Sequence, residues 1–184
     1  MKNITILQHD YKSLYAVYKI TNFLSSDYLE QITNKTIELT NQDSMSKTTG
    51  VKANMTKYDE LLKHEDYKNL FSSVLEYLTM ILRLRSAIGT QKYRHTVFDA
   101  WGMQHLKGDY TLNHNHGQSN WSIVYYMRVP TDDTYIHFDE FNRGELIEPN
   151  SLFIFPGLLN HSVNKHTSDI SRVSISANIM SESI

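Results

Sequence analysis

The chain has 184 residues, of which 40% are hydrophobic, so it is long enough for one domain with a buried core. It contains no cysteine, which excludes disulfides, thiolate metal ligands and cysteine nucleophiles. A formal net charge of −2 without a run of Lys or Arg disfavours nucleic acid as a partner. The N-terminus lacks the apolar stretch of a signal peptide, and no apolar run approaches the ~20 residues that span a bilayer. We therefore expect a soluble, intracellular (cytoplasmic) protein; no sequence pattern bears on its oligomeric state.

The first half of the chain predicts one strand followed by helices. Residues 14–20 alternate apolar and polar side chains, as a half-buried strand does. Ser and Asp residues that can cap a helix precede an amphipathic pattern, so we expect a helix over about 25–41. Residues 42–57 are polar and predict a loop. A second amphipathic helix is expected from about residue 58 or 67 to about residue 84.

The pattern changes at Tyr93, where short β-rich runs separated by turn signals replace the helical spacing. The runs cover residues 93–107, 121–129, 133–139, 144–147, 151–155, 161–164 and 171–179. Such spacing predicts a β-sandwich or a small barrel of about eight strands, with the helices packed outside one sheet. We expect a single domain, 1–184, in which 1–92 form a strand and a helical flank and 93–184 form the all-β core.

Two histidine patterns in the β-rich half suggest metal ligands. His114 and His116 are separated by one residue, so on a strand both imidazoles would point to one face and could bind one ion. Alone, such a pair is as often surface or hydrogen-bonded. His161 begins a strand after an apolar run that ends at Pro156-Gly157; alone, it would be an incidental histidine at a hairpin.

Arg172 and Ser174 form a third pattern, because they share one face of the last predicted strand. A buried arginine is costly unless an anion pairs with it, and its planar fork suits a carboxylate. From parity alone, Arg172 could equally lie on the outward face. The order of the patterns, with Arg172 eleven residues after His161, would place a metal triad and a carboxylate anchor on successive strands.

The segment from Phe98 to Ile179 resembles the Fe(II)/2-oxoglutarate-dependent oxygenase superfamily, and within it a group from phage and marine bacterial genomes. Four sequence patterns support the resemblance: Trp101 before the His-x-His, Ser-x-x-Tyr-Tyr at 122–126, Phe-Pro-x-x-x-x-His-x-Val at 155–163, and an Arg-x-Ser strand ending in Asn178. The resemblance implies an all-β core of the double-stranded β-helix (jelly-roll, cupin-like) type with flanking N-terminal α-helices.

The resemblance also implies an enzyme, a dioxygenase that oxidises a small molecule or a protein side chain while 2-oxoglutarate is decarboxylated to succinate. The implied cofactor is Fe(II), with His114 and His161 as ligands. Arg172 would bind the far carboxylate of 2-oxoglutarate. Three further residues hold positions that face this cosubstrate: Ser174, Tyr126 and Gln104, the last because it stands ten residues before His114.

One departure from the superfamily concerns the metal ligands. The usual site has two histidines and one carboxylate, written His-x-Asp/Glu…His, whereas His116 stands at the carboxylate position. Three arrangements are open: His116 is a third ligand, His116 lies outside the ligand set, or Asp109 or Asp139 reaches the metal from another strand. We favour His116 as a ligand, because two-residue parity brings it to the metal directly.

Two other functions remain open. Three histidines with an open position also suit Zn(II), which would make the protein a hydrolase or an isomerase. Alternatively, the chain is a non-catalytic, cupin-like module that binds a metal and 2-oxoglutarate. Among the remaining residues, we expect Trp101 in the core or the pocket wall, His105 buried and hydrogen-bonded, and His166 at the surface.

Overall fold

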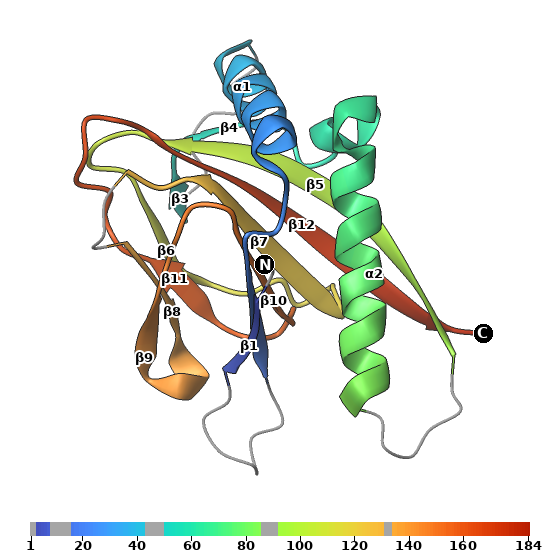
Figure 1. Ribbon diagram of the computed structural model, residues 1–184. Coiled ribbons are helices and arrows are strands. Elements are labelled where there is room, and N and C mark those ends of the chain that lie inside the picture. The colour runs from blue at the N-terminus through green and yellow to red at the C-terminus, as the bar shows by residue number, and fades with distance from the viewer. Residues whose placement is uncertain (1–2, 8–15, 43–49, 86–91, 131–133) are drawn as a thin grey trace.

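The computed structural model describes residues 3–7, 16–42, 50–85, 92–130 and 134–184. In this part of the chain, two antiparallel sheets face each other and two helices cover the outer face of one sheet (Figure 1). This arrangement confirms the predicted all-β core with flanking N-terminal helices. None of the described helices combines the length and hydrophobicity needed to cross a membrane.

The larger sheet has seven strands, and all of its neighbouring strands are antiparallel. Their order is β1 (Asn3–Leu7), β2 (Val17–Thr21), β10 (Ser151–Pro156), β7 (Trp121–Arg128), β12 (Arg172–Ser183), β5 (Tyr93–His105) and β4 (Asn54–Met55). The smaller sheet has five strands, in the order β3 (Val51–Lys52), β6 (Tyr110–His114), β11 (His161–Val163), β8 (Tyr135–Phe138) and β9 (Arg143–Leu146).

The connectivity of β5 to β12 produces the double-stranded β-helix. Along the chain, each of these strands lies in the opposite sheet from the strand before it, except at the β8–β9 hairpin. The core of the larger sheet is therefore β10-β7-β12-β5, and the core of the smaller sheet is β6-β11-β8-β9. The crossings hold the inner faces of the two sheets opposite each other, and the functional residues described below project between them.

The helices differ from the prediction mainly at their ends. The first, α1, spans Ser26–Gln42, close to the expected range. The second, α2, spans Lys68–Arg85, and two 3-10 turns at Glu60–Lys63 and Glu65–Tyr67 occupy the region where an earlier start was considered. The predicted loop contains β3 and β4, while its residues 43–49 lie outside the described part of the chain.

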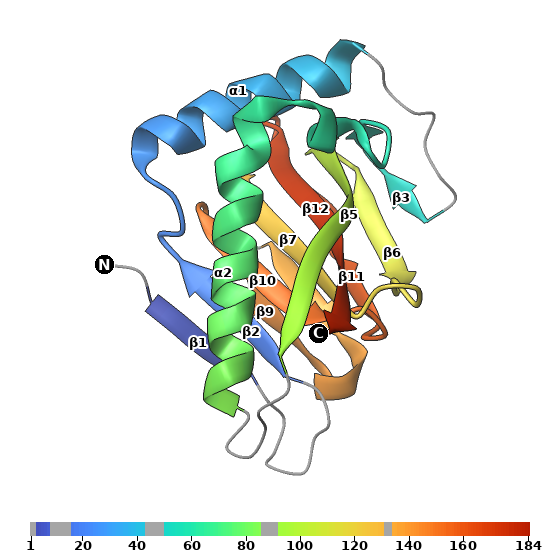
Figure 2. The ribbon, with the colours of Figure 1, turned by 90° about the vertical axis from the view of Figure 1, so that its right-hand side faces the viewer.

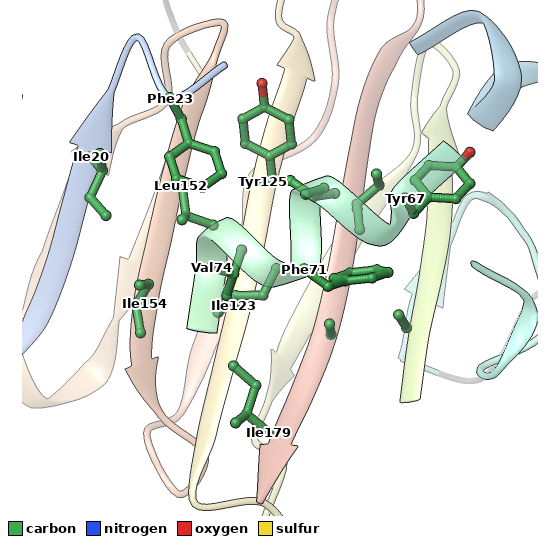
Figure 3. Packing of buried hydrophobic residues seen from close by; sticks show 14 of the residues in the cluster. Ile20, Phe23, Tyr67, Phe71, Val74, Ile123, Tyr125, Leu152, Ile154 and Ile179 are labelled. Carbon is green, nitrogen blue, oxygen red and sulfur yellow. The ribbon is translucent and has the colours of Figure 1, made fainter. Parts of the chain in front are cut away.

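The main hydrophobic core lies between these helices and the outer face of the larger sheet. In Figure 2, α2 crosses this face and α1 lies along one end of it. The apolar positions of both helices meet side chains from β2, β7, β10 and β12. Figure 3 shows this packing for α2. Residues that are fully buried there include Ile20, Phe23, Ile32, Val74, Tyr125, Leu152 and Ile175. The inner face of the same sheet carries both apolar and polar side chains, several of which line the space between the sheets.

Strand β12 shows this division most clearly. Val173, Ile175, Ala177 and Ile179 face the helices, and the alternate residues Arg172, Ser174, Ser176 and Asn178 face the space between the sheets. All eight are buried, because the helices cover one face of the strand and the smaller sheet faces the other. The strand therefore brings an arginine and three hydrogen-bonding residues into a confined interior.

Candidate metal centre

The three predicted histidines come together at one end of the smaller sheet. His114 is the last residue of β6 and His161 is the first of β11, and the two are direct partners in the antiparallel pairing. Directly opposed residues point to the same face, so their ring centres lie 4.4 Å apart. The ring of His116 is 5.2 Å from that of His161, and one ligand atom from each histidine lies within 4.8 Å of the others.

His116 reaches this group by a different route from the expected one. It lies beyond the end of β6, so strand parity does not orient it. Instead, its backbone N–H donates to the Gly157 carbonyl (2.7 Å), and its own carbonyl accepts from the Ser119 N–H (2.8 Å). A Cβ on Gly157 would lie 2.9 Å from the His116 carbonyl oxygen, so the close approach of the two loops requires glycine. The turn at Gly157, directly after β10, therefore fixes the position of His116.

Hydrogen bonds to the backbone assign the tautomers of two histidines. Nδ1 of His114 lies 2.8 Å from the Leu112 carbonyl oxygen, and Nδ1 of His161 lies 3.0 Å from that of Leu159. A carbonyl oxygen only accepts, so each Nδ1 carries the proton and donates it. Each Nε2 then keeps a lone pair, which is the form that binds a metal ion.

The protonation states also suit metal binding. Burial, with smaller effects from the neighbouring histidines, lowers the pKa of His161 to about 3. Burial and His114 lower the pKa of His116 to about 4. Both imidazoles are therefore neutral near pH 7, as ligands must be. A cation bound among them would not have to displace protons.

No carboxylate joins this group among the described residues. Asp109 accepts a hydrogen bond from the Leu106 N–H at 2.9 Å and lies 3.7 Å from the Lys52 ammonium. Asp139 accepts from the Asn113 side chain at 2.6 Å. Both carboxylates that the sequence offered as substitutes thus have partners elsewhere, and the donor set consists of three neutral imidazoles.

The histidines line a cavity of about 360 Å³ between the two sheets, and Arg172 lies at its other end. Arg172 has no exposed surface, yet none of its three guanidinium nitrogens has a hydrogen-bond partner. The hydroxyl of Ser174 is likewise buried and unpartnered. Burial lowers the pKa of Arg172, although the guanidinium remains charged at any physiological pH.

An unpaired buried charge is so costly that its presence points to an anion that completes it. Tyr126 borders the same place, because it is the register partner of Ser174 on β7 and is 2% exposed. Arg172, Ser174 and Tyr126 therefore present cationic and hydroxyl donors to one small volume. A carboxylate fits these donors, since it can accept both a bidentate guanidinium pair and further hydroxyl hydrogen bonds.

Gln104 corrects the prediction. It lies on the helix-facing side of β5, where its amide donates to the Ser171 hydroxyl (3.0 Å) and accepts from Thr40 (3.5 Å), and it does not line the cavity. The reason is parity: Trp101 and His105 face the cavity, so Gln104 must face away. The alternation on this strand, rather than the distance to His114, was the usable signal.

His105 occupies the place expected for Gln104. Its ring is buried and pairs with the Thr111 hydroxyl at 3.2 Å, as predicted, while Nδ1 has no partner and the residue is directly opposite Arg172 in the sheet. Burial, Arg172 and His166 hold the pKa of His105 well below its usual value, so the ring is neutral.

His166 was expected at the surface, but it is 1% exposed and hydrogen-bonds the Ile170 carbonyl, so that expectation was wrong.

No family model matches the sequence, and no curated protein is significantly similar to it. Solved structures do match. The viral collagen prolyl hydroxylase from Paramecium Bursaria Chlorella virus-1, solved with 2OG, is 15% identical over 91% of this chain and 96% of its own, with a TM-score of 0.64. A prolyl-4-hydroxylase from Pseudomonas putida is 12% identical over 89% and 91%, with a TM-score of 0.67.

A third match is HygX from Streptomyces hygroscopicus, solved with nickel, 2-oxoglutarate and hygromycin B. It is 10% identical over 89% of this chain and 82% of its own, with a TM-score of 0.60. The chain has the fold of the 2OG-Fe(II) oxygenases. The predicted jelly-roll architecture is thereby confirmed, and at this level of identity the comparison concerns the fold.

Proposed function

We propose that the protein is an Fe(II)- and 2-oxoglutarate-dependent dioxygenase that oxidises a small molecule or a protein side chain. One observation supports it above the others: a three-histidine group and a buried, unpartnered arginine line the same cavity. A cavity that binds a metal at one end and a carboxylate at the other suits a ligand that carries both a chelating keto acid and a second carboxylate. The fold is that of proteins solved with this cosubstrate.

In this proposal, His114, His116 and His161 hold the metal as neutral nitrogen ligands. Fe(II), when bound, supplies the activation of O2 that couples substrate oxidation to conversion of 2-oxoglutarate into succinate and CO2. One oxygen atom enters succinate and, in a hydroxylation, the other enters the substrate. Three neutral ligands leave both positive charges of Fe(II) uncompensated, so the dianionic cosubstrate balances a charge that a carboxylate ligand balances in the usual site.

The remaining cavity residues bind and orient the cosubstrate. Arg172 and Ser174 donate hydrogen bonds to its far carboxylate, and Tyr126 adds a phenol at the same end. The pocket wall is otherwise rich in apolar side chains, including Ile123, Val124, Ile136, Phe155 and Val163. These side chains exclude water, which strengthens the arginine–carboxylate pairing and confines the oxidation to the bound substrate.

The test is a spectroscopic titration under anaerobic conditions. Fe(II) and 2-oxoglutarate together should give a visible charge-transfer band with the unmodified protein, and His161→Ala should abolish it. His137 lies exposed on β8 outside the cavity, so His137→Ala is the matched control and should keep the band. Absence of the band in the unmodified, folded protein would contradict the proposal.

The absence of a carboxylate from the donor set favours one second candidate. Three neutral histidines with an open position are also a catalytic zinc site, which would make the protein a hydrolase or an isomerase with Arg172 holding an anionic substrate. Metal analysis of protein purified without added metal, combined with an oxygen electrode, separates the candidates. Turnover with zinc in the absence of oxygen would favour the second, and succinate formation that consumes oxygen favours the dioxygenase. Stoichiometric 2-oxoglutarate binding without any succinate would instead indicate a non-catalytic module.

A further inference from the structure

The cavity continues past the metal site, away from Arg172, to a second polar end. On β12 the residues that face the cavity recur at every second position from Arg172 to Asn178, and β5 supplies a partner for each, from His105 to Asp99. Six residues of strand correspond to about 20 Å. A five-carbon dicarboxylate, with four C–C bonds, extends over only about 6 Å. A cosubstrate bound at Arg172 therefore cannot reach Asp99.

The metal site lies between these two ends. Trp101 is the next cavity-facing residue after Asp99 on β5, and it packs against His116 with 5.8 Å between ring centres. Asp99 is thus about 7 Å further along the strand than the residue that contacts the histidine group. Asp99 does not belong to that group, whose ligand atoms come from histidines. It borders the part of the cavity that the proposed cosubstrate leaves free.

Asp99 is the one carboxylate among the described residues that line the cavity, and it lacks a counter-ion. Its Oδ1 is buried without a hydrogen-bond partner, and none of the ion pairs found in the described residues includes it. Burial raises the pKa of Asp99, while hydrogen bonds from Asn178 lower it in part. Oδ1 is thus a buried acceptor without a donor, in a carboxylate that is partly exposed in the cavity wall.

Neighbouring side chains hold this carboxylate in place. The hydroxyl of Ser122 donates to Oδ1 of Asn178 at 2.8 Å, which orients the amide so that its N–H groups point away from Ser122. These groups are then free to donate to Asp99, in agreement with the effect of Asn178 on its pKa. Ser119 continues the chain with a 3.0 Å contact to Ser122. Asn178 and the two serines therefore form a polar network beside Asp99 in the cavity wall.

Two aromatic rings stand beside the carboxylate. Tyr58 packs edge-on against Trp101, with 5.0 Å between ring centres, and its carbonyl accepts from the Ala100 N–H at 2.6 Å, which fixes it next to Asp99 along β5. Both rings line the cavity; Trp101 is 5% exposed and Tyr58 is 44% exposed, so Tyr58 forms the rim. Aromatic faces attract cations, and a carboxylate among them strengthens that preference.

We propose that Asp99, with Tyr58 and Trp101, is the subsite that recognises a cationic group of the oxidised substrate, an alkylammonium or a guanidinium. That the cation belongs to the oxidised substrate rests on the proposed dioxygenase; the cation site itself does not. The substrate would enter past Tyr58, pair its charge with the carboxylate of Asp99, and extend its carbon chain toward the metal. A neutral or anionic molecule of the same shape would leave Asp99 unpaired and bind more weakly.

The test measures binding in the absence of metal and turnover. The chain has two tryptophans, so Trp121→Phe leaves Trp101 as the one fluorescent reporter beside the subsite. The probes are butylammonium and butylguanidinium, compared at equal ionic strength with their neutral isosteres butanol and butylurea. Calorimetric titration of the chain with both tryptophans repeats the comparison, so the result does not depend on that substitution.

We expect the two cations to bind at least tenfold more tightly than their isosteres, and Asp99→Asn to remove that difference, because hydrogen bonds to charged groups contribute about this much. The matched control is Asp59→Asn, which removes the same charge from an exposed carboxylate next to Tyr58 that pairs with Lys63. It should keep the preference. Thermal denaturation checks that each variant is folded.

Two results would overturn the subsite: butylurea binding as tightly as butylguanidinium, or Asp59→Asn weakening the cations as much as Asp99→Asn does. The dioxygenase can fail separately. A cation preference that depends on Asp99, without a charge-transfer band from Fe(II) and 2-oxoglutarate, would support the subsite and reject the reaction. A band without any cation preference would reject the subsite alone.

Discussion

Arg172 offers the sharpest test, because its effects on stability and on binding have opposite directions. In the ligand-free protein its guanidinium is buried and unpartnered, so it costs free energy. Replacing it by methionine, which has a similar length and no charge, removes that cost and keeps most of the packing. We expect Arg172→Met without ligand to melt at the same temperature as the unmodified protein, or higher.

Ligand-induced stabilisation should show the opposite effect. A ligand at 100 times its dissociation constant stabilises a folded protein by about 2.7 kcal/mol. For a chain of this size, 1 kcal/mol shifts the melting temperature by roughly 2–4 °C, so 2-oxoglutarate with Zn(II), which does not undergo turnover, should raise it by roughly 5–10 °C. Arg172→Met loses charged hydrogen bonds to the carboxylate of about 1.5–3 kcal/mol each. The melting temperature of this variant should therefore hardly change when 2-oxoglutarate is added.

Scanning calorimetry with and without 2-oxoglutarate measures both quantities in one experiment. Arg94→Met is the matched control, since Arg94 is exposed and pairs with Glu182 at 2.8 Å, far along β5 from the cavity. A drop of several degrees in the ligand-free Arg172→Met variant would show that the arginine has a structural partner. An unchanged ligand-induced shift would show that the carboxylate binds elsewhere. Either result would refute the reasoning.

Three further predictions concern the histidines. His161→Ala should weaken Zn(II) binding by at least tenfold in a competition titration, whereas His137→Ala should not change it; equal affinities would exclude His161 as a ligand. His116→Asp should retain Fe(II) binding, because it restores the usual carboxylate, while His116→Leu should lose at least tenfold in affinity, and an unaffected Leu variant would place His116 outside the ligand set. The folded-state pKa values of His161 (about 3) and His116 (about 4) lie below the unfolded value near 6.5, so the unfolded state binds more protons at acidic pH. The stability of the metal-free protein should therefore be complete above about pH 6.5 and fall as the pH drops toward 4. Denaturant titrations measure it, and stability that rises on acidification would contradict this prediction.

The parts of the fold that the sequence predicted are those that local periodicity determines. The amphipathic spacing placed α1 and α2, and alternation placed most strands of the core. The strands that it missed, β1, β3 and β4, have two to five residues, too few for a clear alternation. β3 and β4 also depend on partners far along the chain, in β6 and β5. The strand β6 lies outside the expected β-rich runs, although the interpretation of His114 assumed a strand at that position.

The residues of the site also differ in how far the sequence alone revealed them. His161 and Arg172 were found because the resemblance assigns a metal ligand and a carboxylate anchor to their positions, whereas parity alone left the direction of Arg172 open. The structure places them at the starts of β11 and β12, and both line the cavity. Gln104 was assigned by its distance from a histidine instead of by parity, and its actual contacts lie under α1. His116 was assigned correctly to the histidine group for the wrong reason, because a loop held by Gly157 orients it. Asp99 carries no sequence motif, and its proposed role follows only from the folded cavity, where its Oδ1 lacks a partner and Tyr58 and Trp101 line the same space.

The central position of β12 has a consequence for how the chain acquires its structure during synthesis. β12 pairs with β5 on one side and β7 on the other, yet it follows both of them in the chain by more than forty residues. Until it emerges from the ribosome, β5 and β7 each expose an unpaired edge. The nascent chain therefore carries two edges that can pair with other chains, and the long sequence separation makes the closing step slow. One late strand thus both covers these two edges in the completed protein and delivers Arg172 to the cavity.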